Sequence, residues 1–350
     1  MSSFFAIIQY ILMLELLLVF SIVCLVYFIK IYYVIKNKVD LKKNKRVENI
    51  FLLASRHELV LTKSIIKFLK GFDFDLALFN ASNLSHAVKN QIIQEVLLPK
   101  ARKYARSRNL VKKVLATEYF QLGMEKQDEI VMIKLLKDPI LLVSQNAVLA
   151  AFKTSSKLLI NMVIDLEVEK SRFYQSVNLG QLAGASKDLG RIIIERLAKE
   201  SNPKVLAFGF LILAHLPVEL DALTIAEQHL KSHNIELILN ILNYLAHVKT
   251  QKTIQIIRNY LIAKQWEVRT RAVQLLGKLK DNASIDAMAS MLRDQEWWVR
   301  HRAAEALGNL GAEGILKLEA QNPNVDRYAY EAAVQVLRSL EAKKISQEGN

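Results

Sequence analysis

Apolar positions recur at a fixed spacing in the C-terminal part of the chain. Within residues 264–311 one set occurs twice, the second copy 31 residues after the first: Val268, Ala272, Leu276 and Leu279, then Val299, Ala303, Leu307 and Leu310. In each copy these residues fall at i, i+4, i+8 and i+11, which is one face of an α-helix. The small alanine on this face is expected to let a neighbouring helix approach closely. Self-similarity at this period predicts a solenoid of stacked units.

A second amphipathic segment separates the two copies. Residues Ser284–Leu292 place four apolar residues on one face, and Asp294 follows at the expected turn; the four are Ile285, Met288, Met291 and Leu292. Two helices within one period predict a helical hairpin as the repeating unit. The same frame continues upstream, slipping around residues 171–184, and downstream in a degraded form. We therefore predict an all-α fold with an α-solenoid over residues 99–342.

The repeated sequence motif is similar to that of a known protein family. Each copy reads W-x-V-R-x-R-A-x-x-x-L-G-x-L, from Trp266 to Leu279 and from Trp297 to Leu310. This resembles the short HEAT-like repeat of phycobilin lyases and of many bacterial scaffold proteins. The resemblance implies a solenoid of HEAT-like hairpins, and it does not imply lyase activity, because the motif is a packing signature.

The N-terminal segment has a different pattern, with almost no polar positions. Residues 4–29 are apolar apart from Gln9, Glu15 and Ser21. At 1.5 Å per residue they make about 39 Å of helix, more than the roughly 30 Å bilayer core requires. We predict a transmembrane helix, in which Glu15 is a candidate contact to another transmembrane helix. A cleaved signal peptide is the alternative, but it needs a basic start and a shorter apolar run.

Basic residues follow the apolar segment. Residues 30–46 include Lys36, Lys38, Lys42, Lys43, Lys45 and Arg46. The positive-inside rule then predicts a single-pass protein of the cell (inner) membrane, with its N-terminus outside and its solenoid in the cytoplasm. We expect these six residues to contact anionic lipid headgroups. Residues 47–98 are predicted as a helical cap with one amphipathic helix ending near Gly71 and a loop over 72–85. Residues 343–350 are predicted as a flexible tail.

Net charge is concentrated outside the repeats. The chain carries +14, of which residues 1–46 contribute +5 and residues 100–113 contribute +7. The block over 100–113 is either a solvated helix face or a second contact with a membrane or an acidic partner. The solenoid itself is nearly neutral, which argues against a nucleic-acid partner.

No constellation of residues predicts catalysis or a cofactor. HEAT-repeat deoxyhypusine hydroxylase needs several His-Glu pairs, and this chain has one, His57-Glu58. Trp266, Trp297, Trp298 and Asp294 could imitate the cleft of a HEAT-like DNA glycosylase, but packing at the inter-helix turn is the better interpretation of the shared tryptophan position. His229 and His233 have metal-compatible spacing without evident further ligands. The single cysteine, Cys24, excludes an intrachain disulfide.

The repeated arginines leave two interpretations open. In HEAT-type repeats a turn aspartate commonly bonds an arginine of the second helix, so Asp294 with Arg300 or Arg302 would form a ladder between units. Asp138 suits the same role in an earlier unit. The alternative is contact with a partner, because Arg and Trp dominate protein–protein hot spots. The candidate partner-binding residues are Arg269, Arg271, Trp298, Arg300 and Arg302.

These observations predict a scaffold and not an enzyme. The expected function is a membrane-anchored cytoplasmic adaptor whose solenoid surface binds a partner protein, and that partner could itself be a membrane protein. The alternative is a regulatory or accessory subunit of a membrane enzyme or transporter. A HEAT-fold enzyme such as a DNA glycosylase is the least favoured interpretation.

Overall fold

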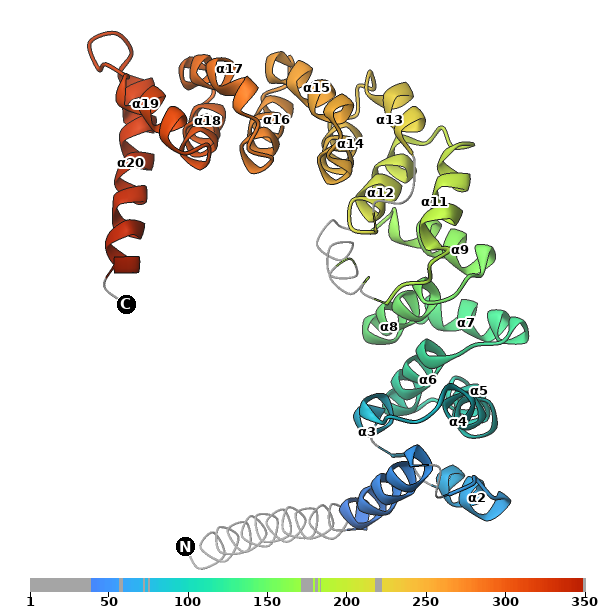
Figure 1. Ribbon diagram of the computed structural model, residues 1–350. Coiled ribbons are helices and arrows are strands. Elements are labelled where there is room, and N and C mark those ends of the chain that lie inside the picture. Colours follow the sequence, from blue (N-terminus) through green and yellow to red (C-terminus); the bar gives the residue numbers. More distant parts are fainter. Residues whose placement is uncertain are drawn as a thin grey trace, which may run out of the picture. The chain divides into compact units, whose positions relative to one another are not determined.

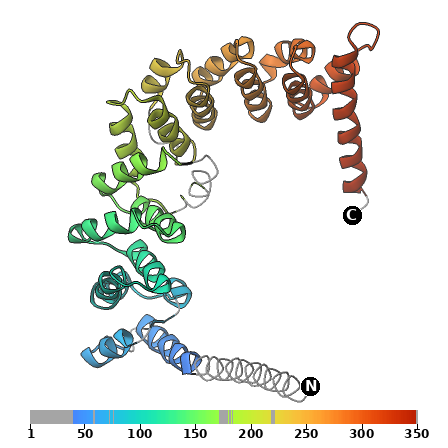
Figure 2. The same cartoon turned by 180° about the vertical axis from the view of Figure 1, so that it is seen from behind.

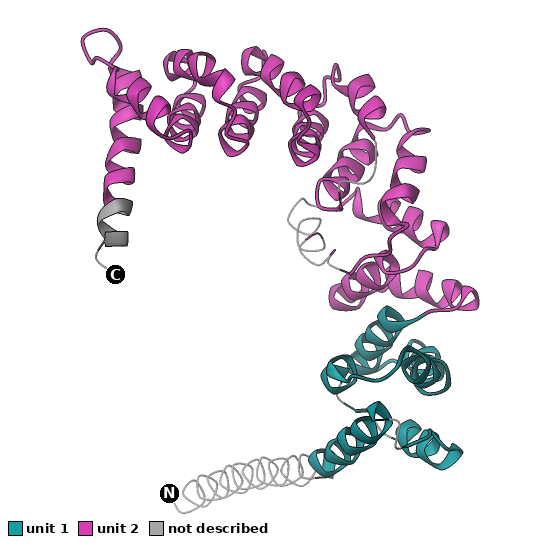
Figure 3. Ribbon diagram, viewed as in Figure 1, with its two compact units in different colours: residues 1–123 teal, residues 124–350 magenta. Residues whose placement is uncertain are grey.

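The computed structural model describes residues 39–56, 59–71, 73–74, 76–170, 179, 182, 184–217 and 222–348. Within these ranges every regular element is helical, and no strand occurs. The chain divides into two compact units, residues 1–123 and residues 124–350 (Figure 3). The predicted all-α fold class is confirmed for the described part of the chain.

The first unit is built from short helices of unequal length. A helix over residues 39–55 is followed by α2 (Lys63–Lys70), α3 (Leu76–Ala81), α4 (His86–Ile92), the π-helical η1 (Ile93–Leu97), α5 (Leu98–Tyr104) and α6 (Leu110–Leu122). The run α4–η1–α5 is continuous, and its π turn lies just before Pro99. Proline lacks the amide hydrogen that an α-helix needs at that position, so local rearrangement of the hydrogen bonds is expected there.

Aromatic residues and one aspartate tie these helices together. Phe51 packs edge-on against Phe74 and Phe79, with ring centroids 5.8 and 5.9 Å apart. The carboxylate of Asp73 accepts hydrogen bonds from the Tyr104 hydroxyl at 2.9 Å and the Tyr119 hydroxyl at 3.1 Å. Burial and the neighbouring Asp73 raise the pKa of Tyr104 to about 12. The segment between α2 and α3 is thereby held against α5 and α6.

The second unit is a regular series of helices (Figure 1). In chain order they are η2 (Lys126–Asp128), α7 (Glu129–Leu136), α8 (Leu141–Phe152), α9 (Lys157–Glu167), α11 (Leu189–Leu197), α12 (Pro203–Leu213), α13 (Leu223–His229), α14 (Ile235–Val248), α15 (Gln251–Asn259), η3 (Tyr260–Ile262), α16 (Trp266–Lys278), η4 (Asn282–Ser284), α17 (Ile285–Ser290), η5 (Met291–Arg293), α18 (Trp297–Asn309), α19 (Ala312–Glu319) and α20 (Arg327–Glu348).

The later helices of this unit pack as hairpins that stack on one another. α13 packs on α14, α15 on α16, α17 on α18 and α19 on α20. The second helices α12, α14, α16, α18 and α20 also lie side by side, each against the next. Figures 1 and 2 show the first helices α13, α15, α17 and α19 on one side of this row. We call the face formed by α14, α16 and α18 the second-helix face.

The apolar frame found in the sequence forms the core of this row. Val268, Ala272, Leu276 and their counterparts in the next repeat are all fully buried. α16 and α18 also approach closely at another small residue, Gly277, where an added Cβ would come 2.7 Å from the Cα of Ala306. Glycine in the repeated Leu-Gly pair, and not only the predicted alanine, therefore sets the spacing between these second helices.

Two expectations about the first unit are wrong. The predicted single helix ending near Gly71 is two helices, because the chain leaves the helix after residue 55 and restarts at Thr62, which caps α2. Leu53 and Val60, both apolar and both within the predicted helix, are exposed. The predicted loop over 72–85 contains α3. The two compact units divide after Gly123, within the range predicted as solenoid. At the C-terminus, α20 extends to Glu348, into the segment predicted as a tail.

The predicted transmembrane helix over residues 4–29 lies outside the described residues, and so does Glu15. Within the described ranges, no helix combines the length and the apolar character that crossing a bilayer requires.

Candidate protein-binding surface

An exposed aromatic cluster lies at the start of α18. Trp297 and Trp298 are 47 and 49 % exposed, and their rings meet edge to face with centroids 4.6 Å apart. One helical turn later His301 stacks flat on Trp297 at 4.9 Å. These contacts fix the rings of three neighbouring side chains while leaving both indoles open to solvent. Trp297 therefore packs against Trp298 and His301 at the start of α18, while nearly half of its surface remains exposed.

Two of the predicted arginines accompany this cluster on the second-helix face. Arg302 donates from Nη1 to Glu305 at 2.5 Å, and both side chains are about one third exposed. Arg271, at the same repeat position on α16, donates to Gln274 at 2.9 Å. Each arginine is therefore held along its own helix by a residue three positions later, with its charge near the surface. Trp298 and Arg302 are four residues apart and share one side of α18.

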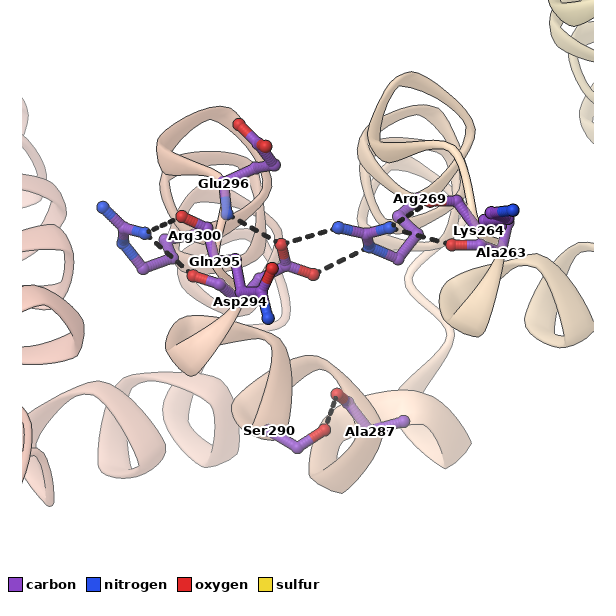
Figure 4. A network of polar contacts seen from close by, with 9 residues as sticks. All are labelled: Ala263, Lys264, Arg269, Ala287, Ser290, Asp294, Gln295, Glu296 and Arg300. Atoms are coloured by element: carbon purple, nitrogen blue, oxygen red, sulfur yellow. Dashed lines mark hydrogen bonds and ion pairs between the residues drawn. The ribbon is translucent and has the colours of Figure 1, made fainter.

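The other two predicted arginines take part in the framework between repeats (Figure 4). Arg269 on α16 binds the carboxylate of Asp294 through Nε at 2.7 Å and Nη2 at 2.8 Å. Its Nη1 donates back to the carbonyl oxygens of Ala263 and Lys264. Arg300 on α18 repeats the second contact, donating from Nη1 to the carbonyl oxygens of Asp294 and Gln295. The predicted ladder exists, but the carboxylate of Asp294 pairs with Arg269 of the preceding repeat and not with Arg300 or Arg302.

The geometry of this pair changes the acidity of Asp294. Burial alone would raise the pKa of the carboxyl group, but hydrogen bonds from Arg269 and from the Glu296 amide outweigh it and hold the pKa below its usual value. Two parallel N–H···O bonds to one carboxylate are among the stronger polar contacts in proteins. Asp294 is therefore a structural anion joining α16 to the turn before α18, and its carboxylate is already engaged.

A second rung of the ladder was not predicted. Arg258 on α15 binds Asp281, at the start of the next hairpin, through Nε at 2.8 Å and Nη2. The hydrogen bond from Arg258 holds the pKa of Asp281 below its usual value, and Ser284 adds a further hydrogen bond. In the sequence this pair is an isolated Arg on the first helix of one hairpin and an Asp before the first helix of the next hairpin. Neither residue belongs to the repeated motif. Asp138, expected to be an earlier turn acid, accepts a hydrogen bond from the Ile140 amide before α8.

The predicted membrane-surface residues are only partly described. Lys36 and Lys38 lie outside the described residues, while Lys42, Lys43, Lys45 and Arg46 lie on the helix over 39–55. Lys42, Lys45 and Arg46 are exposed, and the Arg46 guanidinium lies 4.4 Å from the centre of the Phe68 ring. From the block over 100–113, Lys100 is buried and donates to Asp73 and to the Leu69 carbonyl oxygen. Lys100 is therefore part of the core of the first unit and not of a surface patch.

No metal centre is evident in the described ranges. No group of three or more His, Cys, Asp or Glu side chains there is arranged to hold an ion. His229 ends α13 and His233 follows in the turn before α14, so the two do not share a helix face. The pair His57-Glu58 lies outside the described residues.

Comparison with known proteins identifies the repeats. Residues 261–340 match the family of HEAT repeats. No curated protein matches the chain in sequence. The chain is similar in structure to an engineered protein (15 % identity, 63 % of this chain and 98 % of that chain, TM-score 0.34) and to human deoxyhypusine hydroxylase in complex with glycerol (18 %, 73 % and 98 %, TM-score 0.31).

The chain is also similar in structure to a designed armadillo repeat protein, with 17 % identity over 61 % of this chain and all of that chain, at a TM-score of 0.29. Superpositions with scores this low carry no inference about function. The family match runs from within η3 into α20, and it agrees with the stacked hairpins seen there. The C-terminal part of the second unit is accordingly built of HEAT repeats.

Proposed function

We propose that this protein is a membrane-anchored scaffold that binds a partner protein through the second-helix face. The observation that carries the proposal is the exposed pair Trp297 and Trp298 at the start of α18. Solenoids of stacked repeats commonly bind partners along an extended face of this kind. The proposal assigns the chain a binding role and no catalytic step, cofactor or nucleic-acid contact.

The chemistry of the surface favours a protein partner. Half-exposed indoles supply a large apolar area at low cost in side-chain entropy, and an adjacent Arg supplies directed hydrogen bonds. Arg302 and Arg271 stand at one repeat position on neighbouring helices, so a partner lying across α16 and α18 would meet one arginine from each. The ion pair of Arg302 with Glu305 is exposed and can exchange for a partner carboxylate at little cost.

The anchor rests on the amino-acid sequence. Residues 4–29 have the length and apolar character of a transmembrane helix, and Lys36, Lys38, Lys42, Lys43, Lys45 and Arg46 follow on the side expected to face the cytoplasm. Tethering both scaffold and partner to one membrane would raise their effective concentration, so that modest affinity suffices. Glu15 would offer a hydrogen bond to a membrane-embedded partner.

The binding surface is tested by copurification from the cells that express the protein. Full-length chain is isolated in mild detergent, and the partner recovered per chain is compared between the native sequence and Trp298→Ala. Loss of a hot-spot tryptophan costs about 2 kcal/mol, or roughly 30-fold in affinity. Leu316→Ala is the matched control, because Leu316 is 62 % exposed on the first helix α19. Equal recovery with Trp298→Ala and with the native chain would refute the binding surface.

The same preparation separates the scaffold from the alternative function. A polytopic membrane protein recovered in fixed stoichiometry would favour an accessory subunit of a membrane enzyme or transporter, whereas several soluble partners in varying amounts would favour a scaffold.

The anchor is tested separately by fractionation. We expect the full-length chain to stay in the membrane pellet after extraction at alkaline pH, and a chain lacking residues 1–46 to appear in the supernatant. Release of the full-length chain would contradict the anchor and leave the binding surface untouched.

A further inference from the structure

Arg269 and Arg300 occupy the same position in consecutive repeats and make the same contact with the backbone. Each donates from Nη1 to two successive carbonyl oxygens in the turn before its own helix, at 2.8–3.0 Å. This contact fixes the plane of the guanidinium. Nε and Nη2 then point away from the turn and can together donate two hydrogen bonds to one acceptor group. Figure 4 shows the two side chains extending in the same sense from α16 and from α18.

The two donors differ in what they bind. Nε and Nη2 of Arg269 take the carboxylate of Asp294. For Arg300, no acceptor lies within hydrogen-bonding distance of Nε or Nη2 in the described part of the chain, and its Nε is buried without a partner. Leaving a buried donor of a charged group unsatisfied is costly, so an acceptor is expected at this place.

The sequence explains why the chain does not supply this acceptor itself. Asp294 stands two residues before Glu296, the N-cap of α18. Two residues before Asp326, which precedes α20, the chain has Asn324. Asp326 itself is used as a helix cap, since its Oδ1 accepts a hydrogen bond from the Ala329 amide. The ladder thus lacks its last carboxylate.

Arg300 lines a pocket with room for the carboxylate end of a side chain. The pocket has a volume of about 470 Å³ and is lined by Arg293, Asp294, Gln295, Arg300, Asp326 and Tyr328. The ring of Tyr328 lies 5.1 Å from the Arg300 guanidinium and forms one wall. Asp294 is neutralised by Arg269, which leaves the charges of Arg293 and Arg300 against that of Asp326. The remaining charge is +1, which a single carboxylate balances, whereas a doubly charged phosphate would leave one negative charge unbalanced beside Asp326.

We propose that this pocket binds the side-chain carboxylate of an aspartate or glutamate from the partner protein. The bound group would take the place that Asp294 holds on Arg269, with one oxygen on Nη2 of Arg300 and the other on Nε, which a rotation of the half-buried side chain would expose. A guanidinium fork matches a carboxylate in this bidentate way, which a lysine cannot reproduce. The partner would thereby complete the ladder where the last hairpin of the chain does not.

This inference rests on the proposed function, because the carboxylate is assigned to a bound protein. It can be tested without that protein, by following the Arg Nε–H resonances of the ¹⁵N-labelled full-length chain in detergent during titration with sodium acetate. Sodium chloride at matched ionic strength is the reference titration. Arg300→Lys and Arg269→Lys identify the two resonances, and the measurement itself uses the native chain.

We expect the Arg300 resonance to shift in a saturable manner, with a dissociation constant on the order of 10 mM for so small a ligand. The Arg269 resonance should stay in place, because Asp294 already occupies that donor. A blocked tripeptide with a central aspartate should reproduce the shift, and its asparagine counterpart should not. An unmoved Arg300 resonance, an equal shift in chloride, or parallel shifts of both arginines would overturn the proposal.

Two further outcomes separate the parts of the inference. A stronger response to a tripeptide whose only carboxylate is its C-terminus would overturn the assignment to a side chain. Acetate binding together with unchanged partner recovery in Trp298→Ala would retain the pocket and refute the second-helix surface. Loss of recovery in Trp298→Ala without acetate binding would do the reverse.

Discussion

The repeats containing α16 and α18 are nearly the same in sequence and play different parts in the molecule. Both carry Trp, Val, Arg, Arg, Ala, Leu and Gly at matching positions, and both bury the same apolar stripe. α16 lies between α14 and α18, whereas α18 lies between α16 and the long α20. Identical side chains therefore meet different neighbours, and the neighbour decides whether a residue supports the fold or remains open for binding.

Three pairs of positions illustrate the difference. Nε and Nη2 of Arg269 donate to the carboxylate of Asp294, whereas Nε of Arg300 has no acceptor in the described part of the chain. Gly277 meets the backbone of α18, whereas Gly308 meets flexible side chains of α20. Trp297 is 47 % exposed and stacks on His301. In the preceding repeat the residue that corresponds to His301 is Thr270, which has no ring on which Trp266 could stack. A sequence motif that is repeated within a chain predicts a shared fold, but it does not by itself predict a shared role.

The largest contrast is expected for the two glycines. A Cβ at Gly277 would come 2.7 Å from the Ala306 Cα, so Gly277→Ala must push α16 and α18 apart. A Cβ at Gly308 would come 3.1 Å from Val336 Cγ1 and 3.2 Å from Leu340 Cδ1, which can rotate away. We expect Gly277→Ala to lower the free energy of unfolding by about 3 kcal/mol and Gly308→Ala by about 1 kcal/mol or less. Urea denaturation of both variants checks the ranking, and equal losses would contradict the close approach.

The next contrast concerns the two ladder arginines. Arg269→Gln and Arg300→Gln both remove the bonds to two turn carbonyls, so that part of the cost is common. Only Arg269→Gln also leaves the carboxylate of Asp294, which is 13 % exposed, without its partner. The free energy of unfolding should therefore fall by about 2 kcal/mol more in Arg269→Gln than in Arg300→Gln. If the two variants unfold at the same urea concentration, the ion pair does not stabilise the repeats as argued.

The pH dependence of stability sharpens the same comparison. The pKa of Asp294 is lower in the folded chain than its unfolded value of about 3.9, so its stabilisation is complete above about pH 4. It is lost as the pH falls through the lowered pKa. Arg269→Gln removes the main cause of the lowering, and its free energy of unfolding should fall less between pH 5 and pH 3 than that of the native chain. Arg300→Gln should keep nearly the native slope, and an equal change of slope in both variants would contradict the assignment.

Periodicity predicted the parts of the fold that depend on local pattern. The buried stripe of Val268, Ala272 and Leu276 could be predicted because helical spacing decides which residues face the neighbouring helix. The break in the helix after residue 55 could not, since Leu53 and Val60 continue the helical spacing although both are exposed. The end of α20 was also missed, because a polar segment rich in Glu, Lys and Ala reads as a tail although these residues favour helix.

The candidate site shows the same limit. The resemblance to HEAT-type repeats suggested that Asp294 pairs with Arg300 or Arg302. In the structure Nη1 of Arg300 donates to carbonyl oxygens of the turn, and the carboxylate of Asp294 binds Arg269 on α16. The registry between repeats, which no single repeat encodes, decides this pairing. The exposure of Trp297 could not be predicted either, because the repeat position that it shares with Trp266 does not determine which side chains lie against it.

The smallest expected effect is on the stability contributed by Arg302. Its ion pair with Glu305 lies along one helix, and the two side chains are 34 and 39 % exposed. Pairs of this kind contribute about 0.5 kcal/mol or less, so Arg302→Ala should unfold at almost the native urea concentration. Partner recovery in mild detergent should nevertheless fall, because the proposal places Arg302 beside Trp298 in the interface. Arg191→Ala serves as the control, since Arg191 pairs with Glu195 on the exposed side of α11. A fall in recovery of the same size in Arg191→Ala would show that the loss of any surface charge has this effect. That result would contradict the assignment of the partner interface to the second-helix face.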